Sequence, residues 1–134
     1  MASTKNIISR DFPPEPTLRR LPWYLAYVAM LRSRDIKYVS STTISKEMNV
    51  DASQIAKDLS VLNIKGKTRI GYEVATLEKV LRDFLGFSNG HNAVMIGVGS
   101  LGSALIADTG LERFGLNIVA GFDVSPAVVG TTIK

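Results

Sequence analysis

The most constraining feature of the sequence is a run of three glycines between two short apolar segments. The apolar segments cover residues 93–96 and 118–122, and the glycines are Gly97, Gly99 and Gly102. When a Gly-x-Gly-x-x-Gly run follows a strand and opens a helix, the chain turns sharply and its backbone can approach a phosphate closely. The sequence therefore predicts a β-α-β unit of the Rossmann type, in which a helix joins two parallel strands.

This glycine run has the features that hold a dinucleotide. Gly97 permits the tight turn, Gly99 leaves room for a pyrophosphate, and Gly102 lets the helix pack closely on the strand. The helix begins near Ser100 and Leu101, so its free N–H groups and the positive end of its dipole would face the phosphates. We therefore predict that these residues contact a bound nucleotide.

An acidic residue, Asp123, follows the second apolar segment. It lies about 20 residues beyond the last glycine, where an aspartate can accept hydrogen bonds from the hydroxyls of the adenosine ribose. Its charge would repel a 2′-phosphate, so the sequence favours NADH and NAD⁺ over the phosphorylated dinucleotides. The alternative is a β-α-β unit that holds no dinucleotide.

The positive charge of the chain lies before this unit. Residues 1–90 carry a net charge of +5 and residues 91–134 carry −1, within a total of +4. A polyanion would therefore bind to the first part of the chain rather than to the second. Helical periodicity in this first part predicts a helix at about 17–34, a short helix that ends at Met48, a third that begins after Asp51, and a fourth at about 75–85.

The second and third helices show capping signals. The segment 40–42 offers N-cap hydroxyls for the helix that runs to Met48, and Asn49 can end it because asparagine tolerates the left-handed conformation. Asp51 is placed to cap the next helix, and Gln54 gives that helix a box-like start. Two helices joined by so tight a turn indicate a helix-turn-helix.

The third helix has a polar and basic outer face, and a basic segment around a glycine-centred turn, residues 63–72, follows it. Such a segment suits the β-wing of a winged helix. The candidates for contacts with base edges in the major groove are Ser53, Gln54 and Lys57. The candidates for contacts of the wing with phosphates or the minor groove are Lys65, Lys67 and Arg69. The alternative is a small helical domain with an ordinary charged surface.

Together these patterns predict a mixed α and β chain with two domains. We expect a winged-helix DNA-binding domain at residues 1–86, a linker at 87–91, and the N-terminal part of a Rossmann domain at 92–134. The chain has no cysteine, which excludes disulfides and thiolate ligands. No apolar run approaches the roughly 18 residues that span a membrane, and we expect a cytoplasmic location.

No arrangement of residues in the sequence indicates catalysis or metal binding. His91 is the only histidine, and no carboxylate pair, nucleophile set or metal-ligand spacing stands out. We predict that His91 is an exposed linker residue and that the chain is not an enzyme. Two other functions remain open: a DNA-binding regulator whose Rossmann part only dimerises, and the front part of an NAD-dependent oxidoreductase.

Short motifs occur in one order along nearly the whole chain. They are Arg20-Leu21-Pro22-x-Tyr24 in the first helix, Val39-Ser40-Ser41 before the second, Gln54-Ile55-x-Lys57-Asp58-Leu59-Ser60 in the third, Gly66-Lys67 and Gly71-Tyr72 in the wing, the glycine run, and Phe122-Asp123-Val124-x-Pro126 with Gly130. In this order they resemble the Rex family of redox-sensing transcriptional repressors. The resemblance extends to a point just after the second Rossmann strand, so we expect a truncated member.

The resemblance implies a homodimer that binds palindromic, double-stranded operator DNA through paired winged helices. It also implies that NADH releases the DNA, whereas NAD⁺ competes for the same site and leaves the repressor bound. Ala26 and Ala56 stand where the family usually has arginine, and the segment 108–111 replaces a Tyr-Pro-Gly-Phe-like loop. These departures predict an altered operator preference or an altered redox response.

Overall fold

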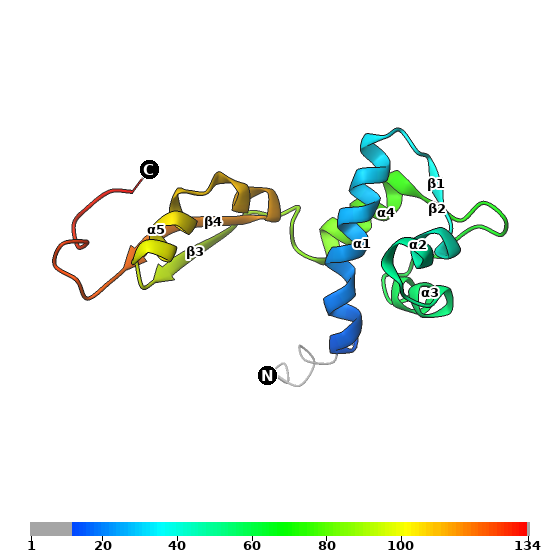
Figure 1. Ribbon diagram of the computed structural model, residues 1–134, viewed down its shortest axis with the longest axis horizontal. Coiled ribbons are helices and arrows are strands. Elements are labelled where there is room, and N and C mark those ends of the chain that lie inside the picture. Colours follow the sequence, from blue (N-terminus) through cyan, green and yellow to red (C-terminus); the bar gives the residue numbers. More distant parts are fainter. Residues whose placement is uncertain (1–11, 134) are drawn as a thin grey trace, which may run out of the picture. The chain divides into compact units, whose positions relative to one another are not determined.

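The computed structural model describes residues 12–133. Contacts between residues divide the chain into two compact units, with the division after Leu81. The first unit is mainly helical, and the second contains a parallel pair of strands (Figure 1). The division falls inside α4 (Val74–Phe84), so the domain bounds given above stay a prediction. Among the described residues, no helix is long and apolar enough to cross a membrane.

The first unit has the element order of a winged helix. Its elements are α1 (Glu15–Ser33), β1 (Tyr38–Val39), α2 (Ser41–Met48), α3 (Ala52–Ser60), β2 (Tyr72–Glu73) and α4 (Val74–Phe84). β1 and β2 are antiparallel, with Tyr38 opposite Glu73 and Val39 opposite Tyr72. This pairing joins the chain before α2 to the chain after the wing, so the wing is held at its base.

The core of the first unit is built on the inner face of α1. Leu21, Leu25 and Val28 recur at helical spacing on this face and are buried, whereas Leu18 is only half-buried. Pro22 lies inside α1, which continues past it in both directions. The other buried apolar side chains of this unit are Tyr24, Tyr27, Leu31, Val39, Ile44, Ile55, Leu59, Leu62, Tyr72, Val74, Leu77 and Leu81.

Two large aromatic side chains of this unit's helices lie outside the core. Tyr24 and Tyr27 are buried, but Trp23 is 61% exposed. Leu77 of α4 is buried, but Phe84 is 40% exposed. Phe84 is the last residue of α4, so it lies beyond the part of the helix that faces the core.

The boundaries of α2 are set by the capping residues that the sequence predicts. The Ser40 hydroxyl accepts a hydrogen bond from the N–H of Thr43 at 3.1 Å. Asn49 ends the helix with φ 53° and ψ 41°, in the left-handed region. Both capping predictions are therefore confirmed.

The predicted box at the start of α3 is wrong. The side chain of Asp51 makes no capping hydrogen bond. The amide nitrogen of Gln54 donates instead to Asp58 Oδ1 at 2.8 Å, one turn further along the helix. A buried carboxylate needs hydrogen-bond donors, and this bond holds the Gln54 side chain at Asp58.

Asp58 is a fully buried carboxylate that joins α3 to α1. Arg20 binds it through two nitrogens, with Nε 2.6 Å from Oδ2 and Nη2 2.9 Å from Oδ1. The Tyr24 hydroxyl donates at 2.7 Å, the Thr17 hydroxyl at 2.9 Å and Gln54 at 2.8 Å. These donors replace the water that the carboxylate loses on burial, which a buried charge requires.

The same contacts determine how Asp58 titrates. Burial by itself raises the pKa of Asp58, but hydrogen bonds from Arg20, Tyr24, Gln54 and Thr17 outweigh this effect and lower the pKa to about 2. The hydrogen bond to Asp58 raises the pKa of Arg20. Burial, together with the bond to Asp58, raises the pKa of Tyr24. The carboxylate is therefore charged, and the tyrosine neutral, at neutral pH.

The second unit confirms the predicted β-α-β arrangement (Figure 1). Its elements after α4 are β3 (His91–Ile96), α5 (Ser100–Ala107), the 3-10 helix η2 (Thr109–Phe114) and β4 (Leu116–Phe122). β3 and β4 are parallel, with His91 opposite Leu116 and Ile96 opposite Phe122. Gly97 and Gly99 lie between β3 and α5, and Gly102 lies in the first turn of α5, as a Rossmann turn requires.

β3 begins at His91, the last residue of the predicted linker. Its N–H donates to the carbonyl of Gly115 at 2.7 Å, while its side chain is exposed as predicted. Phe87, also in the predicted linker, packs edge-on against Phe114 with ring centres 5.3 Å apart. The strand extends further back than its apolar residues because backbone pairing, not side-chain type, sets its start.

Replacing Asp58 by asparagine should lower the free energy of unfolding by about 3 kcal/mol, because the neutral amide leaves Arg20 without its buried partner. Urea denaturation followed by circular dichroism measures the change. Asp35→Asn is the matched control, since Asp35 pairs with Lys37 at 2.9 Å on the exposed surface, and it should have no measurable effect. Equal losses in both variants would contradict the role assigned to Asp58.

Acid should weaken the fold through the same residue. The pKa of Asp58 in the folded chain, about 2, lies below its ordinary value of 3.8, so its contacts stabilise the fold above about pH 4. This contribution is lost as the pH falls through the folded-state pKa, because the carboxyl is then protonated. The free energy of unfolding should decline over this window in the parent chain and decline less in Asp58→Asn. Identical pH profiles would assign acid unfolding to other groups.

Candidate DNA-binding surface and nucleotide loop

The outer face of α3 presents small and basic side chains to the outside. Ser53, Lys57 and Ser60 are exposed, while Ile55 and Leu59 on the inner face are fully buried. The two faces therefore have separate roles, because the inner one anchors the helix in the core. The outer hydroxyls and ammonium group can contact a nucleic acid without disturbing that core.

Gln54 is placed differently from the other two predicted recognition residues. Its side chain is half-buried, and its amide nitrogen donates to Asp58 at 2.8 Å. A contact with adenine uses that nitrogen as the donor to N7 and the side-chain oxygen as the acceptor from N6. One of the two amide hydrogens is thus engaged within the protein, and a base contact by Gln54 stays a prediction.

The wing is a tight turn closed by backbone hydrogen bonds between Lys67 and Gly71. The N–H of Lys67 donates to the carbonyl of Gly71, and the N–H of Gly71 donates to the carbonyl of Lys67, both at 2.8 Å. Lys65, Lys67 and Arg69 are exposed on this turn, while Tyr72 is buried at its base. All three predicted wing cations are therefore brought together on one short loop.

Gly71 is required where the wing returns to the sheet. It has φ +88°, and a Cβ at this position would overlap the carbonyl of Val39 in β1. Only glycine combines that backbone conformation with so close an approach. The backbone at Gly71 therefore sets how near the wing lies to the strand that precedes α2.

A groove of about 470 Å³ lies between the start of α2, the outer face of α3 and the wing. Its lining includes no carboxylate, and its polar side chains besides Tyr72 are Ser40, Ser41, Ser60, Lys65, Lys67 and Arg69. Three cations and three hydroxyls around a hollow at a helix start are suited to phosphate oxygens. Ser40 and Ser41, which their sequence pattern predicts only as capping residues, therefore also line this groove.

The glycine loop of the second unit has the geometry that the sequence predicts. Gly97 has φ +89°, and a Cβ on Gly102 would overlap the carbonyl of Gly97. A Cβ on Gly99 would meet nothing within 4 Å. Gly102 is therefore needed for packing, whereas the space beside Gly99 is open to a ligand. Ser100 and Leu101, the first residues of α5, are both exposed.

Asp123 connects the end of β4 to this loop. Its Oδ2 accepts a hydrogen bond from the N–H of Val98 at 2.7 Å, and its Oδ1 accepts one from the N–H of Ser125 at 2.8 Å. Backbone hydrogen bonds, first from Ser125 and then from Val98, lower the pKa of Asp123. The carboxylate is therefore negatively charged, as a residue that excludes a 2′-phosphate must be.

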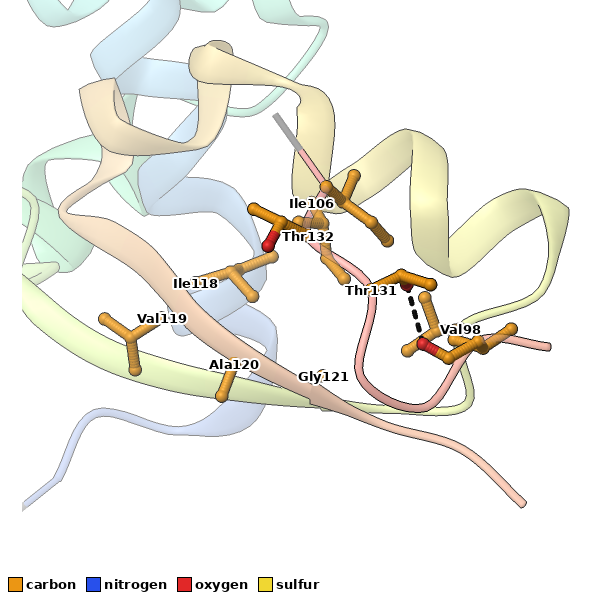
Figure 2. A pocket seen from close by; sticks show the side chains of 10 residues that line it. Val98, Ile106, Ile118, Val119, Ala120, Gly121, Thr131 and Thr132 are labelled. Carbon is orange, nitrogen blue, oxygen red and sulfur yellow. Dashed lines mark hydrogen bonds between the residues drawn. The ribbon is translucent and has the colours of Figure 1, made fainter. Parts of the chain in front are cut away.

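A second hollow, of about 290 Å³, lies between α5, β4 and residues 128–133 (Figure 2). Most of the residues that line it are apolar, and the hydroxyl of Thr131, which also lines it, donates to the carbonyl of Val128 at 2.6 Å. A Cβ on Gly121 would press on Val98 and Ile106, so the glycine lets α5 approach β4. None of the loop residues Gly99, Ser100 and Leu101 lines this hollow, and we assign it no ligand.

Two functional contacts escaped the sequence analysis. The pairing of Arg20 with Asp58 spans 38 residues, so no local pattern reveals it. A signal existed nonetheless, because Asp58 lies beside Ile55 and Leu59 on the apolar side of α3, where an acidic residue needs a partner. The bond from Val98 to Asp123 has no such signal. Among residues 12–133, no group of three or more acidic or histidine residues is placed to hold a metal.

The fold and the two sites define a class of protein, a winged helix followed by the start of a Rossmann nucleotide-binding unit. Residues 14–60 match the family described as "Putative DNA-binding protein N-terminus". A redox-sensing transcriptional repressor Rex from Bacteroides fragilis is 66% identical over 121 residues, which cover 90% of this chain and 55% of the relative.

Solved structures of RSP, a Rex-family repressor, are similar over the same region. RSP in complex with beta-NAD+ and operator DNA gives a TM-score of 0.86 at 36% identity, covering 91% of this chain and 56% of that one. RSP with beta-NADH gives 0.80 at 36% identity, covering 92% and 56%. The chain belongs to the Rex family, and it spans about half the length of the curated relatives it matches.

The two glycines of the loop should respond differently to alanine. Gly102→Ala should lower the free energy of unfolding by about 2 kcal/mol, because the new methyl group overlaps the Gly97 carbonyl and forces a backbone shift. Gly99→Ala should leave stability nearly unchanged, since its methyl group enters open space. Thermal denaturation of both variants measures the difference. A destabilised Gly99→Ala protein would contradict the open space beside this residue.

Proposed function

We propose that this chain forms the DNA-binding part, and the first part of the nucleotide site, of a transcriptional repressor that senses the ratio of NADH to NAD⁺. The observation that carries the proposal is one chain that combines a cationic helix-and-wing groove with a glycine loop open to a ligand. Relatives named Rex, and RSP structures with operator DNA and with both nucleotides, support the same combination. In this role the chain regulates and does not catalyse.

The DNA-binding surface comprises the outer face of α3 and the wing. Ser53 and Lys57 contact base edges in the major groove, where lysine suits the acceptors of guanine. Gln54 joins them through its side-chain oxygen and its remaining amide hydrogen. The wing cations Lys65, Lys67 and Arg69 contact phosphates or the minor groove. Exposure of these wing residues and the absence of carboxylates from the groove lining support this assignment.

The nucleotide site comprises the glycine loop, the start of α5 and Asp123. The pyrophosphate lies beside Gly99, against the N–H groups at Ser100 and Leu101, where the helix dipole favours negative charge. Asp123 already accepts two backbone hydrogen bonds, but two carboxylate oxygens offer about four acceptor positions. The ribose hydroxyls therefore have acceptors left, and NADH and NAD⁺ are preferred over the 2′-phosphorylated dinucleotides.

The working protein is a homodimer that binds a palindromic operator in the cytoplasm. Paired recognition helices related by two-fold symmetry match the two halves of a palindrome. NADH releases the DNA if it binds more tightly to the arrangement that DNA does not favour, and DNA must then weaken NADH binding by the same factor. NAD⁺ occupies the same site but does not prefer the arrangement that DNA disfavours, so it leaves the DNA bound.

Fluorescence anisotropy tests this function with the full-length protein and a palindromic A·T-rich duplex at fixed salt. NADH should weaken DNA binding by about 5- to 150-fold, the usual range of such couplings, while NAD⁺ should leave it unchanged. NADPH should act only at much higher concentration, because Asp123 repels its extra phosphate. DNA binding that ignores both nucleotides would indicate a module whose Rossmann part only dimerises, and NADH consumption with a substrate would indicate an oxidoreductase.

Gly99→Ala tests the nucleotide site separately from DNA binding in the same titration. The variant should fold and bind the duplex like the parent, since Gly99 lies outside the DNA-binding unit. It should nevertheless lose its response to NADH, because the methyl group occupies the space beside the backbone that the pyrophosphate needs. A variant that still responds to NADH would show that the nucleotide does not lie against this loop.

A further inference from the structure

The turn of the wing holds an arginine in a backbone conformation that arginine disfavours. Arg69 has φ +64°, in the left-handed region. Among residues 12–133, the other non-glycine residues with positive φ are Asp35, Asn49 and Asn63. Aspartate and asparagine visit this region because their short polar side chains can bond to the local backbone. Arginine has no such compensation, so Arg69 is the strained member of the group.

No feature of the turn itself calls for a side chain at this position. Arg69 is exposed, and the turn is closed by backbone hydrogen bonds between Lys67 and Gly71. Glycine would adopt the same φ without strain, and it already does so at Gly71. The chain therefore has an arginine at a position where glycine would be free of backbone strain. Strain of this kind is characteristically retained at functional sites.

We propose that Arg69 is the specificity-determining residue of the wing, and that its guanidinium group enters a narrow, A·T-rich minor groove beside the site of α3. This inference rests on the proposed function, because it takes duplex DNA as the partner. It goes further because it assigns the preference for a narrow minor groove to Arg69 alone. Lys65 and Lys67 do not share this preference.

The neighbouring cations explain why Arg69 is not simply a third phosphate contact. Lys65 and Lys67 line the same groove of the protein surface as Arg69, and they already supply positive charge for phosphates. A phosphate needs only a point charge, which a lysine provides without backbone strain. A narrow A·T minor groove instead concentrates negative potential and favours inserted arginine. The planar guanidinium is also less strongly hydrated than an ammonium group, so it loses less hydration free energy when it enters the minor groove.

The test begins with a duplex that the full-length protein selects from a random-sequence pool. The base pairs flanking the α3 site are then replaced by A·T, G·C or inosine·C pairs. Inosine lacks the 2-amino group of guanine, so an inosine·C pair resembles A·T in the minor groove and G·C in the major groove. The parent protein should bind the A·T and inosine·C flanks alike and the G·C flanks about tenfold more weakly.

Arg69→Gly should remove this preference, so that the three duplexes bind with nearly equal affinity. The slope of log affinity against log salt concentration should also fall by about one. The urea midpoint of the variant should not lie below that of the parent, because glycine relieves the strain at this φ. Loss of preference without loss of stability is the result that supports the inference.

Two variants serve as matched controls. Asn63→Gly also places glycine at a left-handed position near the wing, φ 57°, but removes no charge, so it should keep the flank preference. Lys67→Ala removes a charge but no strain, so it should weaken binding to all three duplexes equally. Together they separate the effects of wing flexibility and total charge from the effect of the guanidinium group itself.

Retention of the A·T preference in Arg69→Gly would overturn the inference. Weak binding of inosine·C flanks, like that of G·C flanks, would also overturn it, because the preference would then arise in the major groove. A parent protein that binds its selected duplex without any flank preference would overturn this inference and leave the proposed function standing. A parent that selects no duplex would overturn both.

Discussion

The buried pair of Asp58 and Arg20 is the interaction on which the first unit depends. Apolar packing between α1 and α3 would hold the helices together but would tolerate small sliding. A carboxylate that accepts two bonds from one guanidinium group restricts both distance and direction. Apolar residues of similar volume could be as stable as such a pair. We therefore interpret its value as geometric, because it sets the orientation of the helix that presents Ser53 and Lys57.

A comparable constraint in the second unit comes from close approaches of the backbone. Gly102 lies against the carbonyl of Gly97, and Gly121 lies against Val98. The N–H of Val98 then binds Asp123, which joins the phosphate end of the predicted nucleotide site to its ribose end. Because one hydrogen bond links the two ends, they are positioned before any ligand arrives. Such preorganisation reduces the entropy that binding would otherwise cost.

Local signals predicted the elements well, and contacts distant in sequence explain the failures. The caps at Ser40 and Asn49 depend on neighbouring residues, and so do the glycine turn and the apolar stripe of α1. The box at Asp51 failed because the Gln54 side chain is held by Asp58, whose charge is buried by residues from another helix. The orientation of α3 likewise depends on a contact 38 residues away. Sequence periodicity shows which face is buried, but it does not show which polar groups meet there.

The separation of the two sites limits how a nucleotide can influence DNA binding. The residues proposed to contact DNA lie in one unit and the glycine loop lies in the other. On the proposed function, NADH therefore acts by favouring one arrangement of the dimer over another. The Asp58 contacts hold α3 firmly within its own unit, so the recognition helix moves with the whole winged helix. Half-sites one helical turn apart, about 34 Å, tolerate little change in spacing, so a small shift of each unit would suffice to release the operator.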